Sequence, residues 1–243
     1  MKAIEVVKDH LRPLKHRMLR RPTEISWTKS LGNLVRIGYE PEAVFDIGVA
    51  HGTWELYDIF PRSYFYLCDP DPRSLVYMKK VSDRLRGRCH LGQVALSDDD
   101  GTVDFNLRHD MQGSTLFKSS GNDDDTITMR TLTVRMQRFD TYYDNFPAGA
   151  LVKIDVQGAE MMVLRGMTGA LPKIGAILIE VSVLSTLKGS PEANEVISYL
   201  HEQGFVLADI VGALRRPLDN QIAQMDLLFL PEKSPLRSDR RWG

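Results

Sequence analysis

The sequence contains little cysteine, because Cys68 and Cys89 are the only two among 243 residues. Two thiols are too few for a disulfide-stabilised scaffold or for a zinc site built from cysteines. No apolar run approaches the ~20 residues that a transmembrane helix needs, and the charged N-terminal stretch lacks the apolar block of a secretory signal. These absences predict a protein of the reducing cytoplasm with no transmembrane segment.

Extremes of composition are absent too. Hydrophobic residues make up 43% of the chain and charged residues 26%, which excludes collagen, mucin and wholesale disorder. A chain of this length buries roughly 70% of its unfolded surface, so it needs no disulfide or metal to fold. Because neither a repeat nor a linker is found, we predict one main domain, residues 41–231. A basic helical segment (1–40) precedes it and a basic tail (232–243) follows it.

The formal net charge is only −1, but the charges are unevenly distributed. Residues 1–21 carry seven Lys or Arg against two acids, and the tail is basic through Arg237, Arg240 and Arg241. Such ends could attract an anionic partner such as a membrane surface or nucleic acid. We favour the alternative, a solvated helix face, and expect no nucleic-acid partner. An amphipathic helix, broken or kinked by Pro13, is predicted from the spacing of Ile4, Val7, Leu11, Leu14 and Met18.

From residue 43 onward, short apolar runs alternate with helical patterns, which is typical of a parallel sheet covered by helices. The predicted strands are residues 43–47, 63–68, 90–96, 151–156 and 175–181, and the predicted helices are 73–85, 160–164 and 191–203. Ser190 is expected to cap the last helix, with Pro191 at its first position and Gly204 at its end. Two alternating stretches, 102–107 and 126–136, predict an antiparallel insertion. The runs 205–211 and 225–230 predict an antiparallel pair at one edge of the sheet.

The first candidate site is the sequence DIGVAHGT (46–53), between a predicted strand and a helix. Small residues at Gly48, Ala50 and Gly52 would let a ligand approach the backbone closely. The glycine patterns of dinucleotide folds and of phosphate loops are both absent. The turn therefore favours a nucleoside without phosphates, with Asp46 available to a cationic amino-acid group. The alternative is a tight turn with a purely structural function.

Acidic residues mark the ends of two further strands. Asp69 follows the second strand, where a doubly wound fold holds a ribose through its hydroxyls, or else it only opens the Asp-Pro turn. Lys153 and Asp155 lie two apart in an apolar strand and therefore point to one face. Charges are rarely buried unpaired. The two side chains either pair with each other or place Asp155 at the carboxyl edge of the sheet, where such folds bind ligands.

These motifs, in this order, resemble the FkbM-type S-adenosylmethionine-dependent methyltransferases over residues 41–231. The most specific match is LVKIDVQGAEMMVLRGM (151–167). Further matches are VFDIGVAHGT (44–53), Asp69-Pro70, VALSDDDGTV (94–103), GSTL (113–116), AILIEVS (176–182), HEQGFVLADI (201–210) and QMDLLFL (224–230). Two positions depart from the family pattern. Val49-Ala50 stands for Ala-Asn, which removes a polar side chain near the cofactor, and Gln157 stands for a Glu.

The resemblance implies an α/β fold, a doubly wound, Rossmann-like seven-stranded sheet with the last strand antiparallel and an antiparallel β insertion. It implies S-adenosyl-L-methionine as the cofactor, lying across the carboxyl ends of the first strands. Asp46, Gly48 and Gly52 would then line its methionine end and Asp69 its ribose, while Ala95, Leu96 and Ser97 would lie near adenine. The matched motifs also imply cofactor contacts for Ala50, His51, Thr53, Ser114 and Asp155.

Family members act mostly on hydroxyl groups, so the resemblance implies O-methylation of a sugar, a glycan or a secondary metabolite. A hydroxyl must lose its proton, and the candidate general bases are Asp155, Glu180, His51 and His109. No metal is expected, because the dispersed histidines show no metal-ligand spacing. The expected partner is a small-molecule or glycan acceptor, and a homo-oligomer is compatible with the sequence. The alternatives are a non-catalytic nucleoside-binding module of the same fold and a nucleotide-dependent oxidoreductase.

Overall fold

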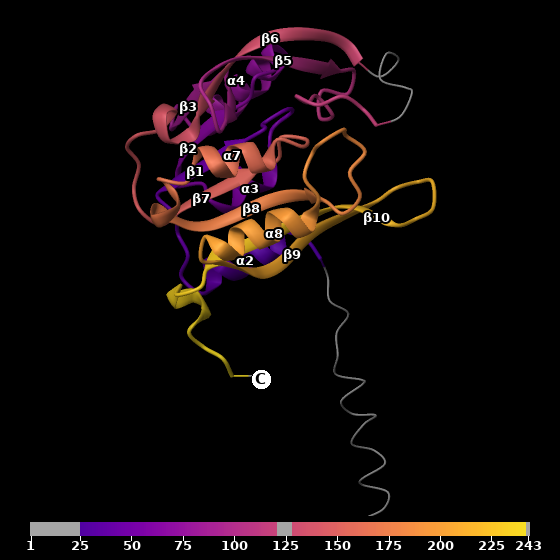
Figure 1. Ribbon diagram of the computed structural model, residues 1–243. Helices are drawn as coiled ribbons and strands as arrows, with labels where there is room; N and C mark the ends of the chain where they lie inside the picture. The colour runs from indigo at the N-terminus through magenta and orange to yellow at the C-terminus, as the bar shows by residue number, and fades with distance from the viewer. Residues whose placement is uncertain (1–24, 121–127, 242–243) are drawn as a thin grey trace, which may run out of the picture.

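The alternating segments of the chain form a seven-stranded sheet with helices on both faces (Figure 1). The computed structural model describes residues 25–120 and 128–241. In order across the sheet, the strands are β3 (Cys89–Gly92), β2 (Tyr64–Cys68), β1 (Ala43–Ile47), β7 (Ala150–Ile154), β8 (Ile174–Ser182), β10 (Ile222–Pro231) and β9 (Phe205–Arg215). β10 is antiparallel to both of its neighbours, and the other neighbouring pairs are parallel. The predicted doubly wound sheet, its antiparallel last strand and the edge pair are confirmed.

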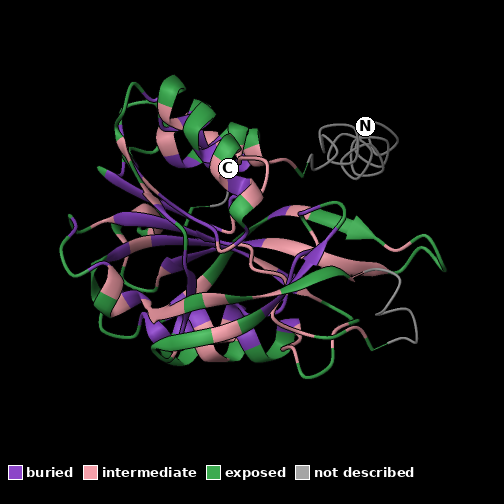
Figure 2. Cartoon of the chain, turned by 90° about the horizontal axis from the view of Figure 1, so that it is seen from above, coloured by how far each residue is buried: buried purple, intermediate pink, exposed green. Residues whose placement is uncertain are grey.

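Helices form a layer on each face of the sheet. One layer contains α2 (Trp27–Arg36), α3 (Trp54–Ile59) and α4 (Leu75–Arg84), and the other contains α6 (Phe139–Tyr142), α7 (Glu160–Gly166) and α8 (Ala193–Glu202). Successive residues of β1 alternate between the two layers, since Val44 packs with the first and Phe45 with the second. The central strands are buried on both faces (Figure 2), as is usual for a parallel sheet.

The order of the strands creates a crevice between β1 and β7. From β1 the chain moves outward through β2 to β3, and it then returns to β7 on the opposite side of β1. Connections that diverge in this way leave space at the carboxyl ends of the two central strands, where open α/β sheets bind ligands. The loops that begin there start with Gly48, Asp69 and Asp155.

The insertion forms a second, three-stranded sheet in the order β4 (Ala95–Ser97), β6 (Thr128–Arg138) and β5 (Gly101–Arg108). β5 and β6 are antiparallel, as predicted, and β4 joins β6 in parallel. The single strand predicted over residues 90–96 is wrong, because the chain leaves the main sheet after Gly92 and β4 belongs to the small sheet. Only Gln93 and Val94 separate β3 from β4, so the sequence reads as one continuous strand.

α8 begins two residues later than predicted. Glu192 is its N-cap and forms a reciprocal capping box with Glu195, whose carboxylate accepts from the Glu192 N–H at 3.0 Å. The Ser190 hydroxyl donates instead to the carbonyl of Leu187 at 3.3 Å. The Ser190 cap is therefore wrong, because the capping box satisfies the first-turn N–H groups without it. The predicted end is confirmed: α8 stops at Glu202, and Gly204 has a φ of +81°.

α2 lies within the predicted N-terminal segment but belongs to the main body. Ser26 caps it by accepting from the Lys29 N–H at 3.3 Å, and Leu31 and Leu34 are buried in the core beside α3. The helix predicted from residues 4 to 18 lies outside the described residues. None of the described helices is long and apolar enough to cross a membrane.

Candidate active site

A cavity of about 870 Å³ opens at the carboxyl edge of the sheet, around the ends of β1 and β7. Its first half is lined by residues 48–53, Asp69, Pro70, 94–96, Phe105 and 110–114. Its second half is lined by residues 25–28, Lys153, 155–157, Glu180, 211–214 and 224–226. This volume lies in the upper part of the range of small-molecule and cofactor sites.

The loop after β1 forms the floor of the first half. Gly48, Ala50 and Gly52 all have positive φ, at +84°, +44° and +98°. A Cβ on Gly48 would lie 1.7 Å from the carbonyl oxygen of Asp155, which no side chain could tolerate. Gly48 is therefore required by the crossing of two loops, and it also lines the cavity. Ala50 adopts a conformation that Asn and Gly tolerate better than Ala does.

Asp46 lies beneath this floor and not in the wall of the cavity. Its carboxylate is fully buried, and the Lys153 ammonium is 3.1 Å from Oδ1. The hydroxyls of Thr53 and Tyr57 donate to the two carboxylate oxygens. Lys153 also donates to the carbonyl of Gly48 at 2.6 Å. The direct contact expected between Asp46 and the ligand is therefore replaced by an indirect effect, in which Asp46 and Lys153 hold the loop above them.

Asp69 lies in the wall of the cavity with only 5% of its surface exposed. Its Oδ2 accepts from the Ala50 N–H at 2.7 Å and its Oδ1 from the Asp71 N–H at 2.8 Å. Burial raises the pKa of Asp69 to about 6, although both N–H donors act in the opposite direction. The carboxylate thus orients the loop after β1, and each oxygen keeps a lone pair for a ligand.

The insertion supplies the rest of the first half. Ala95 and Leu96 line the cavity, whereas Ser97 is fully buried outside the wall and donates to Asp98 at 3.2 Å. Ser114 lines the cavity, and its hydroxyl accepts from the Arg108 N–H at 3.0 Å and from Arg73 at 3.3 Å. Ser97 is therefore the one member of the Ala95-Leu96-Ser97 turn that does not reach the site.

The second half of the cavity contains a linked group of carboxylates and amides. Asp155 lies 3.5 Å from the Lys153 ammonium and accepts from Gln157 Nε2 at 2.9 Å. Gln157 Nε2 also donates to Glu180 Oε1 at 2.8 Å, and Gln224 Nε2 donates to the same oxygen at 2.7 Å. Burial, reinforced by the neighbouring Asp155 and Asp226, raises the pKa of Glu180 to about 9. Near neutral pH, Glu180 is therefore protonated, beside an ion-paired Asp155.

The loop between Asp155 and α7 is held by Glu160. Its Oε1 accepts from the Gly158 N–H at 3.0 Å and from the Val156 N–H at 3.3 Å. Gln157, between them, has a φ of +51°, so the chain makes a tight left-handed turn here. Burial raises the pKa of Glu160 to about 7. This turn points the side chain of Gln157 at both Asp155 and Glu180.

The order of these motifs matches a known family. The model of the FkbM methyltransferase domain matches residues 46–207, which include the loops after β1, β2 and β7. The chain belongs to the FkbM methyltransferase family. It is therefore an S-adenosylmethionine-dependent methyltransferase, and the oxidoreductase alternative falls away.

Solved structures that are distantly similar to this chain include several methyltransferases. The 1,6-didemethyltoxoflavin N1-methyltransferase of Burkholderia thailandensis, bound to its substrate and S-adenosylhomocysteine, is 12% identical with a TM-score of 0.45, over 95% of this chain and 89% of that one. Aeropyrum pernix fibrillarin, with bound S-adenosyl-L-methionine, is 17% identical with a TM-score of 0.43, over 82% and 74%. The precorrin-6y C5,15-methyltransferase of Geobacter metallireducens is 9% identical with a TM-score of 0.43, over 83% and 84%. No curated protein matches the sequence significantly.

The first half of the cavity fits the cofactor of this methyltransferase family. Val94, Ala95, Leu96 and Phe105 form an apolar wall, which suits a flat purine. Asp69 offers carboxylate lone pairs on the same wall, which suit the two hydroxyls of a ribose. In the described ranges, no group of His, Cys, Asp and Glu is placed to hold a metal ion.

The two candidate histidines have different positions in this FkbM protein. His51 lines the cavity, and its ring packs edge-on against Tyr77 with centroids 4.7 Å apart. His109 is exposed and lies outside both described cavities, so the structure does not bring it to the site. Asp155 and Glu180 are brought together through Gln157, as the shared edge of the sheet predicted.

Several residues of the second half were missed by sequence reasoning. Trp27 comes from α2, and its indole Nε1 donates to Asp226 on β10 at 2.9 Å. Gln224 and Asp226 lie in a stretch quoted only for the resemblance, where an acid within an apolar strand was the available signal. For Trp27 no local signal exists, because its partner lies 199 residues away in the sequence.

Proposed function

We propose that this methyltransferase transfers the methyl group to a hydroxyl of a sugar, a glycan or a secondary metabolite, with Asp155 as the general base. The observation that carries the proposal is the arrangement of Asp155, Glu180 and Gln157 in the second half of the cavity. Bound S-adenosylmethionine supplies an electrophilic methyl carbon. A hydroxyl oxygen attacks that carbon well only if its proton is removed, which a nearby carboxylate accomplishes.

Asp155 fits the function of the base better than Glu180 does. The Asp155 carboxylate lies 3.5 Å from the Lys153 ammonium and accepts from Gln157, and its side chain is 35% exposed, so a substrate can reach it. Glu180 is protonated near neutral pH and cannot accept a proton there. Its free oxygen would instead donate a hydrogen bond to the acceptor. His51 remains an alternative base, since its ring lines the same cavity.

In the first half we propose that Asp69 holds the ribose and that Ala95 and Leu96 flank the adenine. The loop of Gly48, Ala50, Gly52 and Thr53 would lie along the methionine end, with Ser114 closing the opposite wall. Asp46 would act through Lys153 and the loop. Holding both reactants in one cavity can account for about 7–11 kcal/mol of the barrier by positioning alone.

Replacement of Asp155 by Asn tests the base directly. Formation of S-adenosylhomocysteine is measured with a set of sugar, phenol and amine acceptors, and binding of S-adenosylhomocysteine is measured by calorimetry. With a hydroxyl acceptor, Asp155→Asn should lower the rate roughly 10²- to 10⁴-fold, while cofactor affinity changes little. The matched control is Asp58→Asn, an exposed acid that pairs with Arg84.

Three results would contradict the proposal. A destabilised but fully active Asp155→Asn would move the base to His51. Transfer to amines alone would replace O-methylation by N-methylation. Binding of S-adenosylhomocysteine without transfer to any acceptor would favour the non-catalytic binding module.

A further inference from the structure

The second half of the cavity is acidic, and the ammonium group of Lys153 in its wall already has partners within the protein. Asp155, Glu180 and Asp226 lie in its wall, with Lys153 as the cation among the described lining residues. Lys153 is 3% exposed and its ammonium contacts Asp46 at 3.1 Å, the Gly48 carbonyl at 2.6 Å and Asp155 at 3.5 Å. Its three N–H donors therefore have three partners within the protein, which leaves none for an anionic ligand.

Hydrogen-bond acceptors also outnumber free donors on this wall. Both N–H groups of Gln157 are used by Asp155 and Glu180, which leaves its carbonyl oxygen. The indole N–H of Trp27 is used by Asp226 Oδ2, which leaves Asp226 Oδ1. A ligand that satisfies such a surface must itself bring donors, as hydroxyl and ammonium groups do and as carboxylates and phosphates do not.

The position of Asp226 is fixed by the sheet. Asp226 lies directly opposite Glu180 on β8 and opposite Gly212 on β9. A Cβ on Gly212 would lie 2.1 Å from Asp226 Oδ2, so the glycine leaves the space that this carboxylate fills. Two acids that face each other across neighbouring strands destabilise the sheet when both are charged, and the closeness of Asp226 is one cause of the raised pKa of Glu180. An acid kept at a cavity wall opposite a second acid, in spite of this cost, indicates a function in binding.

We propose that this wall selects against anionic acceptors, with Asp226 and Trp27 as its specificity-determining residues. The inference rests on the proposed function and narrows its substrate class: the acceptor is a hydroxyl-bearing molecule that is uncharged or cationic where it meets the wall. The electrostatic cost of a buried like-charge contact turns away carboxylated, sulfated and phosphorylated analogues.

Matched pairs of acceptors test the selection. One pair is methyl α-D-glucopyranoside and the corresponding glucuronoside, and the other is methyl 3,4-dihydroxybenzoate and its free acid. The kcat/KM of each is measured with the full chain and saturating S-adenosylmethionine. The neutral member should be favoured by roughly tenfold or more in each pair that turns over, equivalent to at least about 1.4 kcal/mol. Asp226→Asn should reduce that ratio at least threefold, and Asp58→Asn should leave it unchanged.

Other outcomes overturn the inference. Equal or faster transfer to the anionic members would refute it and leave O-methylation intact. It would also point to Arg108, which lines an adjoining cavity of about 230 Å³ shared with Gln157 and Glu180. An unaltered ratio in Asp226→Asn removes Asp226 as the determinant. If the protein binds S-adenosylhomocysteine but methylates none of these four acceptors, the selection is also refuted. Transfer only to amines would instead remove the proposed function itself.

Discussion

Replacement of Lys153 by Met should lower the free energy of unfolding of this protein more than any change to its surface charges does. Lys153 and Asp46 are partners in the register of β7 and β1, and both side chains are almost completely buried, at 4% and 0% exposed. Burial alone lowers the pKa of the Lys153 ammonium, but Asp46 and Asp155 outweigh it and hold that pKa above its ordinary value. The ammonium is therefore charged in the folded protein at every pH of practical use.

The two ends of this ion pair are not equivalent. Without Lys153, Asp46 keeps only the hydroxyls of Thr53 and Tyr57 and is left as a buried, uncompensated charge. Breaking a buried pair from one side costs about 3–5 kcal/mol. For a protein of this size that corresponds to a fall in Tm of roughly 6–20 °C. Asp46→Asn should cost less, because Lys153 keeps Asp155 and the Gly48 carbonyl.

Urea unfolding of the single variants and of Asp46→Asn/Lys153→Met measures the effect. The double variant should recover much of the stability that Lys153→Met loses, because removal of both charges leaves none buried alone. Arg84→Met breaks the exposed pair with Asp58 and should cost at most about 1 kcal/mol. A loss below about 1 kcal/mol for Lys153→Met, or a double variant less stable than Lys153→Met, would refute the reasoning.

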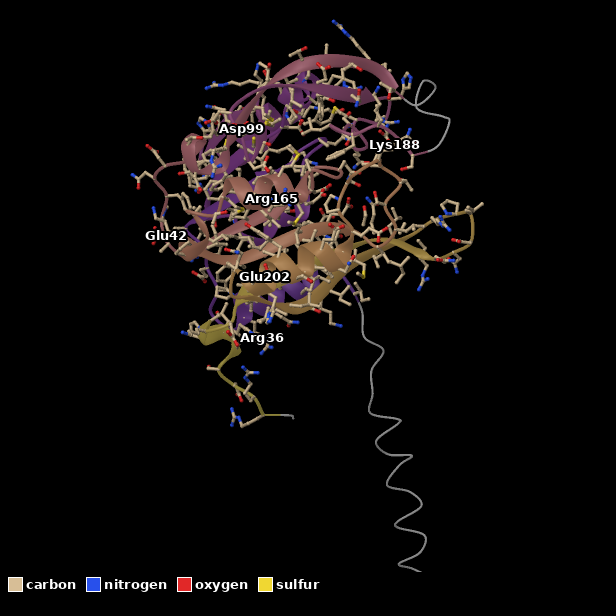
Figure 3. The ribbon with its side chains drawn as sticks, viewed as in Figure 1. Arg36, Glu42, Asp99, Arg165, Lys188 and Glu202 are labelled. Carbon is tan, nitrogen blue, oxygen red and sulfur yellow. The ribbon has the colours of Figure 1, made fainter. Side chains whose placement is uncertain are left out.

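Three further predictions concern single residues. Asp69→Ala should weaken S-adenosylhomocysteine binding, measured by calorimetry, by about 1.5–3 kcal/mol. It should also lower the Tm, since the N–H groups of Ala50 and Asp71 lose their acceptor. An unchanged affinity would remove Asp69 from the site. Gly48→Ala should destabilise the protein far more than Gly38→Ala does. Both glycines have positive φ, but of the two only Gly48 would place a Cβ against backbone. Equal losses of unfolding free energy in urea would contradict the loop crossing. Raised carboxyl pKa values mean that protonation favours the folded state. The stability contributed by Asp69, Glu160 and Glu180 is therefore present below about pH 4. It is lost as the pH rises through about 6 for Asp69, about 7 for Glu160 and about 9 for Glu180. Glu180→Gln should therefore flatten the decline in unfolding free energy above pH 7, whereas Glu202→Gln, an exposed acid on α8 (Figure 3), should leave it unaltered.

The sequence by itself determined where most of the strands lie along the chain and the edge of the sheet at which the site lies. Apolar runs that end in an acid identified Asp69, Asp155 and Glu180, and parallel strands bring such ends to one edge of a sheet. Glycine at residue 204 marked the end of α8 because a positive φ is needed there. These features are local, or follow from a pattern that repeats along the chain, so one sequence is enough to read them.

Only the tertiary structure decided which charges are available to a ligand. Asp46 and Asp69 look alike in the sequence, since each lies at the end of a strand, yet Asp46 is enclosed by Lys153 and Tyr57 while Asp69 reaches the cavity. The contact of Lys153 with Gly48 spans 105 residues, and that of Trp27 with Asp226 spans 199. Such pairs depend on which strands become neighbours and on how a helix packs across them. Hydrophobic periodicity records which face of an element is buried, but not which distant side chain will meet it there.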